Sequence, residues 1–268
     1  MMKFSMAILT GYLFFTISRL FLYVFWLPTK RKCWMWTGVA VSSFLLLSFA
    51  YGAFVTRTDY QVKEVDLKFS NLLVSFNGYR VAFISDIHIG SMCNAEHELE
   101  TLSDILSSTD ADLVLFGDDL VNLHYTELTP QSLNILSKIK GIDGVFAVMG
   151  NHDTGSYIKG STKDFRAENM ASLAVNAATA GWVFLRDGTA YIRRGTDSIA
   201  ITGISGHIHG MQMKIGSLSP ASLMYYEWSG LYENGKGKLY INDGIGSVAF
   251  IASFGARPEI TVINLYRE

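Results

Sequence analysis

Two long apolar runs open the chain and set its first part apart from the rest. Residues 4–27 are interrupted by a single charge, Arg19, and residues 34–55 carry none. A helix needs about 20 apolar residues to cross the hydrocarbon core of a bilayer, so each run is long enough. We therefore predict two transmembrane helices, at 4–27 and 34–55, within a membrane anchor that covers residues 1–56.

The first run has an alternative interpretation, and the surrounding basic residues predict an orientation. A cleaved signal peptide is the alternative for residues 4–27, but the apolar stretch is long for one and a second run follows directly. Three basic residues, 30–32, lie between the runs, against Lys3 and Arg57 outside them. Because positive loops stay in the cytoplasm, residues after 57 are predicted on the non-cytoplasmic side, at the inner membrane if the source is a bacterium.

From residue 56 onward, short apolar runs alternate with Gly, Asp and Asn, a pattern typical of a globular α/β domain. A first strand is expected within residues 65–76. Three further strands each end in a polar cluster: residues 79–85, 112–116 and 144–149. Helices are expected between these strands at 94–108 and 128–142, the second opened by a Thr129–Pro130 cap. The order β-α-β-α-β favours parallel strands joined by right-handed crossovers.

The C-terminal third is richer in strands and in glycine. The strands expected there are residues 182–185, 189–193, 198–204, 238–242 and 259–265. They are predicted to form a second sheet or the far half of a sandwich. Residues 57–268 are then one domain.

Side chains that bind metals gather at the ends of the predicted parallel strands, the edge where ligands bind in open α/β sheets. Asp86 and His88 follow the first of these strands, and extended backbone would send both to the same side. Asp118 lies in a Gly-Asp turn after the second strand, and one carboxylate can bridge two cations. Asn151, after the third, offers an amide oxygen that suits a hard or borderline cation.

A second pair of histidines repeats this spacing. His207 and His209 lie in the segment Gly-His-Ile-His-Gly, residues 206–210. Each cluster alone is common in proteins, and an ordinary turn or surface position explains any one of them. Their joint occurrence in glycine-flanked loops favours a metal site.

Composition and charge exclude several other classes of protein. With 49% hydrophobic and 17% charged residues the chain is not disordered, and a net charge of -2 without a basic stripe gives a nucleic-acid partner no support. Cys33 and Cys93 lie on opposite sides of the second predicted span. No intrachain disulfide and no cysteine zinc site is therefore expected.

The order Asp-x-His, Gly-Asp, Gly-Asn-His-Asp, Gly-His-x-His resembles the calcineurin-like metallophosphoesterase superfamily, from about residue 65 to the C-terminus. Segments 230–232, 240–246 and 254–260 resemble its membrane-associated bacterial phosphodiesterase branch. The resemblance implies an α/β fold, a four-layer α-β-β-α sandwich, with two divalent metal ions of the Mn, Fe or Zn class at the strand ends. It also implies hydrolysis of a phosphodiester, with a lipid or cell-envelope substrate suggested by the membrane anchor.

The resemblance assigns a role to each polar cluster. The implied metal ligands are Asp86, His88 and His209 for the first ion, Asn151 and His207 for the second, and Asp118 as the bridge. His152 is implied as the catalytic residue, placed beside the scissile phosphate to donate to a phosphoryl oxygen or to protonate the leaving group.

The sequence departs from the family pattern in the interval between His152 and His207. The family has another histidine there, a ligand to the second metal, and this chain has none. The interval is also short, as if a segment had been removed between Ser205 and Gly206. The second metal site is then incomplete, and the alternative function is a degenerate, weak or inactive membrane-bound member of the family.

Smaller departures surround the Gly-Asp motif. The family usually has an acidic residue three places after the aspartate, where this chain has Val121, although Asp119 or Asn122 could serve if the loop is one residue longer. His124 is the nearest spare histidine, and an exposed loop position is its commoner explanation.

Three further polar residues have two interpretations each. Asp119 and Asp153 are either groups that orient the ligands or ordinary turn residues. Arg257 either faces a phosphate or forms a salt bridge that holds the last strand.

Overall fold

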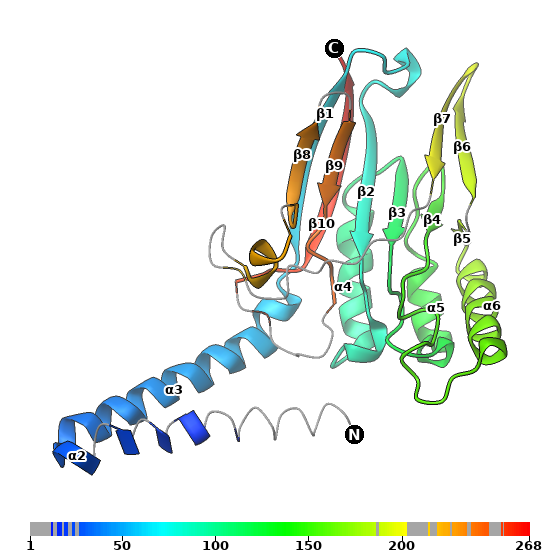
Figure 1. Ribbon diagram of the computed structural model, residues 1–268. Helices are drawn as coiled ribbons and strands as arrows, with labels where there is room; N and C mark the ends of the chain where they lie inside the picture. Colours follow the sequence, from blue (N-terminus) through cyan, green and yellow to red (C-terminus); the bar gives the residue numbers. More distant parts are fainter. Residues whose placement is uncertain are drawn as a thin grey trace.

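A computed structural model describes residues 12, 15–17, 19, 20, 23, 24, 27–185, 188–202, 214, 219–225, 227–234, 237–246, 253 and 255–268 (Figure 1). The helices are α2 (Leu27–Thr29), α3 (Lys32–Phe54), α4 (Ala95–Ser107), α5 (Pro130–Leu136) and α6 (Lys163–Thr179). The strands are β1 (Gln61–Phe69), β2 (Tyr79–Ser85), β3 (Leu113–Gly117), β4 (Val145–Ala147), β5 (Trp182–Phe184), β6 (Thr189–Arg194), β7 (Asp197–Thr202), β8 (Gly230–Asn234), β9 (Gly237–Ile241) and β10 (Glu259–Arg267). Short 3-10 turns are η2 (Thr56–Thr58), η3 (Val74–Phe76), η4 (Ile89–Ser91), η5 (Tyr125–Glu127) and η6 (Pro220–Leu223).

A six-stranded mixed sheet in the order β1-β10-β2-β3-β4-β5 forms the centre of the domain. Strands β2, β3 and β4 are parallel to one another, as the β-α-β order predicts, and β5 continues the sheet parallel to β4. β10 runs antiparallel to β2 and parallel to β1.

The prediction of a second sheet was wrong for the segments that became β5 and β10. β10 is buried along most of its length, because it lies inside the first sheet between β1 and β2. The predicted strands 189–193 and 198–204 form the antiparallel hairpin β6–β7, and the predicted strand 238–242 forms β9, which pairs with β8, a strand that was not predicted.

The helices α4, α5 and α6 cover one face of the sheet. Leu99 and Leu102 of α4 pack with Ala82 and Ile84 of β2 in the larger apolar core. Asn94 caps α4 by accepting a hydrogen bond from the backbone N–H of His97, which confirms the predicted start of this helix.

The second predicted helix is real but shorter than expected. α5 begins after Thr129, which caps it, and ends at Leu136 instead of continuing to residue 142. The chain turns at Gly141, where an added Cβ would lie 2.9 Å from the carbonyl oxygen of Asp112 and from the Cα of Leu113. Because the backbone passes this close to β3, the helix cannot extend through the turn.

Helix α6 was not predicted from the sequence. Thr162 caps it, and its buried residues, Asn169, Leu173 and Ala177, follow one another at intervals of four. Because Asn169 and Ala177 are weak apolar signals, the helical period is hard to see.

The opposite face of the sheet carries a second apolar cluster. Tyr79 and Val81 of β2 and Leu113 of β3 alternate with the residues that face the helices, and they pack against Ile192 of β6. Among the described residues this face is covered by hairpins, and the second helical layer of the predicted four-layer sandwich is not found there. The coarser prediction, a mixed α/β sheet with helices, is confirmed.

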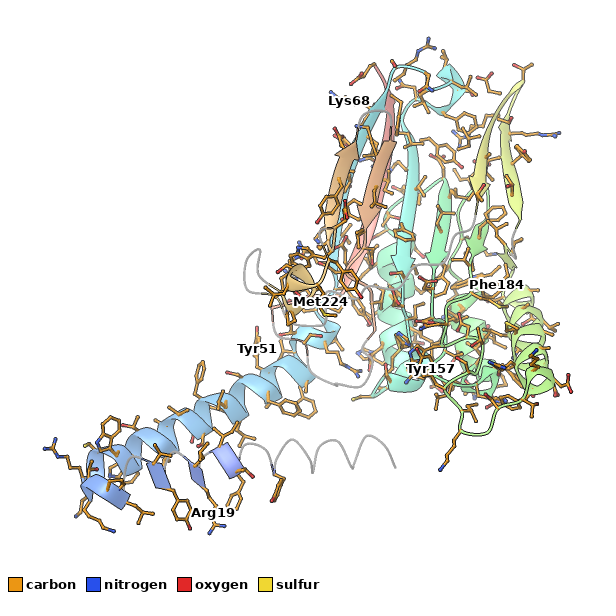
Figure 2. The ribbon with its side chains drawn as sticks, in the orientation of Figure 1. Arg19, Tyr51, Lys68, Tyr157, Phe184 and Met224 are labelled. Atoms are coloured by element: carbon orange, nitrogen blue, oxygen red, sulfur yellow. The ribbon has the colours of Figure 1, made fainter. Side chains whose placement is uncertain are left out.

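One helix near the N-terminus is long and apolar enough to cross a membrane. Among the described residues this helix is Lys32–Thr58; an 18-residue window of it has a mean hydropathy of 1.8 and is 17% buried. Its main part, α3, projects away from the sheet (Figures 1 and 2). Most of the other predicted span, residues 4–27, lies outside the described residues. Cys33 and Cys93 are both free and exposed.

Candidate metal centre

The loops after β2, β3 and β4 meet at the carboxyl edge of the parallel strands, as predicted. The backbone N–H of Asp86 donates to the carbonyl of Gly117 at 3.1 Å, and that of His88 donates to the carbonyl of Asp119 at 3.0 Å. The first two loops therefore continue side by side beyond the sheet. Tyr157, from the segment after β4, lies at the same end of the domain (Figure 2).

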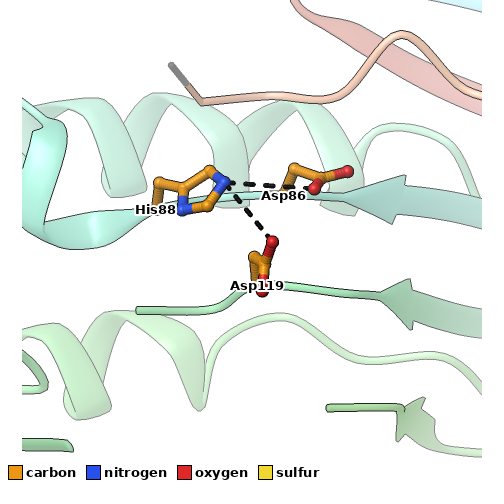
Figure 3. A group of neighbouring side chains, drawn as sticks. All are labelled: Asp86, His88 and Asp119. Carbon is orange, nitrogen blue, oxygen red and sulfur yellow. Dashed lines mark ion pairs between the residues drawn. The ribbon is translucent and has the colours of Figure 1, made fainter. Parts of the chain in front are cut away.

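Three buried side chains converge at this edge. Asp86, His88 and Asp119 each offer one ligand atom, and these atoms lie within 4.8 Å of one another. Nε2 of His88 is 3.8 Å from Oδ2 of Asp119 and 4.0 Å from Oδ1 of Asp86 (Figure 3). The three groups are arranged as ligands of a common ion would be.

The backbone that presents these groups is not extended. Asp86, His88, Asp118 and Asp119 all have φ between 39° and 55°, in the left-handed region. Asp and His tolerate this region better than most residues, although each such position is strained. Asp86 and His88 thus come together as predicted, but through left-handed turns rather than through the side alternation of a strand.

The carboxylate from the β3 loop is that of Asp119 rather than Asp118. Asp118 is buried but is not one of the three convergent groups. Oδ1 of Asp119 accepts a hydrogen bond from the backbone N–H of His152 at 2.7 Å, which ties the β3 loop to the β4 loop. Gly150 permits this contact, since an added Cβ would lie 2.1 Å from the same oxygen.

The family motif has an acidic residue three places after its aspartate. If that aspartate is Asp118, the position falls on Val121, which is fully buried in the apolar core and cannot face the site. If it is Asp119, the position falls on Asn122. Oδ1 of Asn122 is buried and has no hydrogen-bond partner. The longer register of the motif, considered above as an alternative, therefore agrees with the geometry.

Asn151 also has a buried amide oxygen without a hydrogen-bond partner. Its Nδ2 donates to the hydroxyl of Tyr157 at 2.8 Å, while its Oδ1 is buried without a partner. A buried amide oxygen without a partner is costly, and a metal ion would satisfy it. The donor set of carboxylates, imidazole and amide oxygens suits a hard or borderline divalent cation.

His152 lies against the other ring groups of the site. Its ring is stacked on Tyr157 with centroids 4.2 Å apart and meets His88 edge to face at 4.9 Å. Nδ1 lies 2.7 Å from the carbonyl oxygen of Asn122, which can only accept, so Nδ1 carries the proton. In the neutral ring Nε2 is then the acceptor.

Asp153 holds the loops together from behind. Its carboxylate accepts hydrogen bonds from the backbone N–H groups of Leu120, Val121 and Gly150 at 3.0–3.2 Å. Burial raises the pKa of Asp153 to about 7, against the lowering effect of these hydrogen bonds. The geometry therefore supports an orienting role beyond ordinary turn chemistry.

Two supporting residues were missed from the sequence. Asn169 of α6 accepts from the N–H of Tyr125 and donates to the carbonyl of Asp153. Glu127 accepts from the N–H groups of Asn122 and Leu123. Neither residue belongs to a motif. The one local signal was that Glu127 lies close in sequence to Asn122, whose backbone it binds.

The remaining candidates fall outside the group. His124 begins η5 as a capping residue and stacks on Phe165. Arg257 forms a salt bridge with Asp59 at 2.7 Å, the second of its two interpretations. His207 and His209, and the junction at residues 205 and 206, lie outside the described residues.

Comparisons with known proteins match the part of the chain that carries this centre. A family profile described as calcineurin-like phosphoesterase matches residues 79–198. The uncharacterized metallophosphoesterase YkuE of Bacillus subtilis is 22% identical over 258 positions, which cover 81% of this chain and 89% of that protein. The chain belongs to the calcineurin-like metallophosphoesterase superfamily. As a metallophosphoesterase, it is a phosphoric ester hydrolase.

Two further similarities are more limited in extent. The UDP-2,3-diacylglucosamine pyrophosphatase LpxG of Chlamydia muridarum is 27% identical over 125 residues, which cover 47% of this metallophosphoesterase and 33% of LpxG. The crystal structure of the phosphopantetheinyl hydrolase PptH of Mycobacterium tuberculosis superposes with a TM-score of 0.33 at 16% identity, covering 55% of this chain and 49% of that one.

Proposed function

We propose that this metallophosphoesterase hydrolyses phosphodiester bonds of a membrane or cell-envelope substrate with two divalent metal ions bound at the carboxyl edge of its sheet. The observation that carries the proposal is the convergence of Asp86, His88 and Asp119, three buried ligand groups at the ends of parallel strands. The unsatisfied amide oxygens of Asn122 and Asn151 support a site for more than one ion.

The ligand assignment follows the predicted one except that the bridging residue changes and one candidate ligand is added. Asp86, His88 and His209 would hold the first ion, and Asn151 and His207 the second. We assign the bridge to Asp119, because its carboxylate lies among the convergent groups and that of Asp118 does not. Asn122 is a further candidate ligand. The bound ions would clamp the phosphate, generate a nucleophile from water and stabilise the attacking and leaving oxygens.

His152 would act on the proton of the leaving group. The carbonyl of Asn122 keeps Nδ1 protonated, so protonation at Nε2 gives an imidazolium that can donate there. Stacking on Tyr157 and the edge contact with His88 fix the plane of the ring. The position of the His152 ring is thus set by neighbouring rings that take no part in proton transfer.

Attachment to a membrane is supported by α3 and by the similarity to LpxG. The helical stretch Lys32–Thr58 supplies a candidate anchor, and residues 57–268 the catalytic domain. LpxG is named for a diacylglucosamine substrate, which supports a lipid substrate class here. The basic residues 30–32 favour an orientation with the domain on the non-cytoplasmic side of the membrane, at the inner membrane in a bacterium.

The second metal site is proposed to be incomplete. The match to YkuE runs over 258 positions but takes in 81% of this 268-residue chain, so part of that alignment is a gap in this chain. A lost segment between Ser205 and Gly206, which would have carried the missing histidine ligand, agrees with such a gap. The alternative function, a degenerate member with little or no activity, differs from the enzyme in metal content.

The test is metal content together with hydrolysis, measured on the full chain in detergent micelles. Metal equivalents per chain are determined by elemental analysis after dialysis with Mn²⁺, and turnover is followed with bis(p-nitrophenyl) phosphate. A bound ion and hydrolysis above the metal-free control support the enzyme. A chain that binds no metal and hydrolyses nothing supports the degenerate alternative.

A further inference from the structure

Arg57 follows the candidate membrane helix directly, yet its side chain turns into the domain. A basic residue at this place ordinarily extends to the lipid phosphates or to water. Here Arg57 is 5% exposed, and its Nη2 donates to both carboxylate oxygens of Glu98, which is 6% exposed. Its Nη1 donates to the carbonyl oxygen of Ser91 at 3.0 Å.

The two partners of Arg57 lie on either side of the start of α4: Ser91 belongs to the segment that leads from His88 to this helix, and Glu98 to the helix's first turn. Oε1 of Glu98 also accepts hydrogen bonds from the backbone N–H groups of Cys93 and Asn94, at 2.9 and 3.0 Å. The ion pair therefore shapes the whole turn rather than joining two surface side chains. Residues 88–94 are called the His88 loop below.

Ser91 carries the connection on to the candidate metal ligand. Its backbone N–H and its hydroxyl both donate to the carbonyl oxygen of His88, at 2.8 and 2.7 Å. His88 has φ of 48°, a strained backbone conformation that persists only where neighbours determine it. The chain of contacts from Arg57 to Ser91 to His88 supplies such determination.

Directed hydrogen bonds fix the guanidinium of Arg57 at this junction. A small cavity of about 10 Å³ lies beside it, lined by Arg57, Ser91, Met92, Glu98, Ile245 and Gly246. Nε of Arg57 is buried without a hydrogen-bond partner. The guanidinium is therefore held by its bonds to Glu98 and Ser91, and a buried ion pair that loses one partner is strongly destabilised.

We propose that Arg57 and Glu98 form a positioning pair that makes metal binding at Asp86 and His88 depend on the placement of the membrane helix. α3 and η2 hold Arg57, and Arg57 holds the His88 loop in the conformation that presents the imidazole. This inference rests on the proposed function, because that function identifies Asp86 and His88 as metal ligands. The contacts from Arg57 to the His88 loop do not depend on it.

The chain offers a matched control at the same junction. Arg257 forms a second ion pair between the segment after the helix and the domain, with Asp59, and both side chains are more than 40% exposed. Within the described part of the chain, the hydrogen bonds of Arg257 go to Asp59 and none reaches the His88 loop. Arg257→Met therefore removes a tether of the same kind without touching the path to His88.

The experiment compares Arg57→Met, Arg57→Lys and Arg257→Met with the parent chain in lipid nanodiscs. Mn²⁺ affinity is measured from the free-ion electron paramagnetic resonance signal, and amide hydrogen exchange is followed in the His88 loop without metal. We expect Arg57→Met to weaken Mn²⁺ binding roughly 10-fold or more, the lower end of the effect of outer partners on metal sites. Arg57→Lys should retain part of the Mn²⁺ affinity, because lysine keeps the charge but lacks the two parallel donors of the guanidinium.

Exchange in the His88 loop should rise in Arg57→Met and stay at the parent level in Arg257→Met. If both variants alter Mn²⁺ affinity and exchange equally, or if Arg57→Met alters neither, the positioning role is wrong. A parent chain that binds no Mn²⁺ contradicts the proposed function instead, and the exchange comparison still decides the loop contact. If Arg57→Met does not fold, Arg57→Lys gives the same comparison at smaller amplitude.

Discussion

Replacing Asp119 by Asn separates the two possible readings of the Gly-Asp-Asp motif, because Asp118→Asn makes the same change one residue earlier. Asp119 is fully buried and accepts a hydrogen bond from the N–H of His152 at 2.7 Å. Asn keeps an oxygen at this place and loses the charge.

The cost to the metal-free fold is small. A hydrogen bond to a charged acceptor contributes about 1.5–3 kcal/mol and a neutral one about 0.5–1.5 kcal/mol, so Asp119→Asn should cost roughly 1 kcal/mol. Part of this is offset, because the charge of Asp119 disfavours the ionised form of Asp153. The variant therefore stays folded, and its metal binding can be measured.

The cost to metal binding is large. Changing a residue that only supports a ligand costs about 10–100-fold in metal affinity. Asp119 lies within the ligand group itself, so we expect a loss of at least about 100-fold for Asp119→Asn, estimated from the same range. For Asp118→Asn we expect a loss smaller by about tenfold or more on that scale.

The assay is a Mn²⁺ titration of both variants and the parent chain in detergent micelles, with the melting temperature recorded at each concentration. A bound ion stabilises the folded chain by RT ln(1 + c/Kd), where c is the free Mn²⁺ concentration, so the melting temperature keeps rising as c exceeds the dissociation constant Kd. Asp119→Asn should abolish this rise, while Asp118→Asn should retain most of it. The reverse order would return the bridging role to Asp118 and would refute the reasoning from the structure.

Three further predictions concern the catalytic histidine, the tight turn and the anchor. His152→Ala should leave Mn²⁺ content nearly intact and slow hydrolysis of an aryl phosphodiester about 10²-fold or more; loss of metal in step with rate would instead make His152 a ligand. Gly150→Ala should destabilise the domain by about 1–3 kcal/mol in chemical unfolding, because the new Cβ meets a carboxylate oxygen of Asp119; an unchanged midpoint would contradict the close approach. The full chain should remain in the membrane fraction after alkaline carbonate, and its release would refute the anchor. A reporter fused after Glu268 should be active on the non-cytoplasmic side, and activity in the cytoplasm would refute the predicted orientation.

Local signals predicted the central part of the fold well. The strand Tyr79–Ser85 was predicted with its observed bounds, and Asn94 and Thr129 mark the starts of α4 and α5 as observed. These features depend on neighbours a few residues apart, which the sequence displays. The meeting of the three loops follows from the handedness of β-α-β units.

Long-range placement was not predictable in the same way. β10 pairs with β1 and β2, nearly 200 residues away, and the sequence of an apolar strand does not indicate which strands it will pair with. Likewise the choice between Asp118 and Asp119 depends on two consecutive left-handed residues, a backbone state that the letters of the sequence do not specify. Asn169 escaped notice because its two hydrogen bonds join loops that are distant in sequence.

The most direct test of a two-metal phosphodiesterase with an incomplete second site is the number of Mn²⁺ ions bound per chain, before and after a family-like segment is inserted between Ser205 and Gly206. We predict one firmly bound ion and a weakly held second one in the chain as it stands, with hydrolysis partly rescued by excess Mn²⁺. The insertion should raise both the second occupancy and the rate. Two firmly bound ions and full activity without the insertion would contradict the incomplete site, and no bound ion in either form would contradict the metal centre itself.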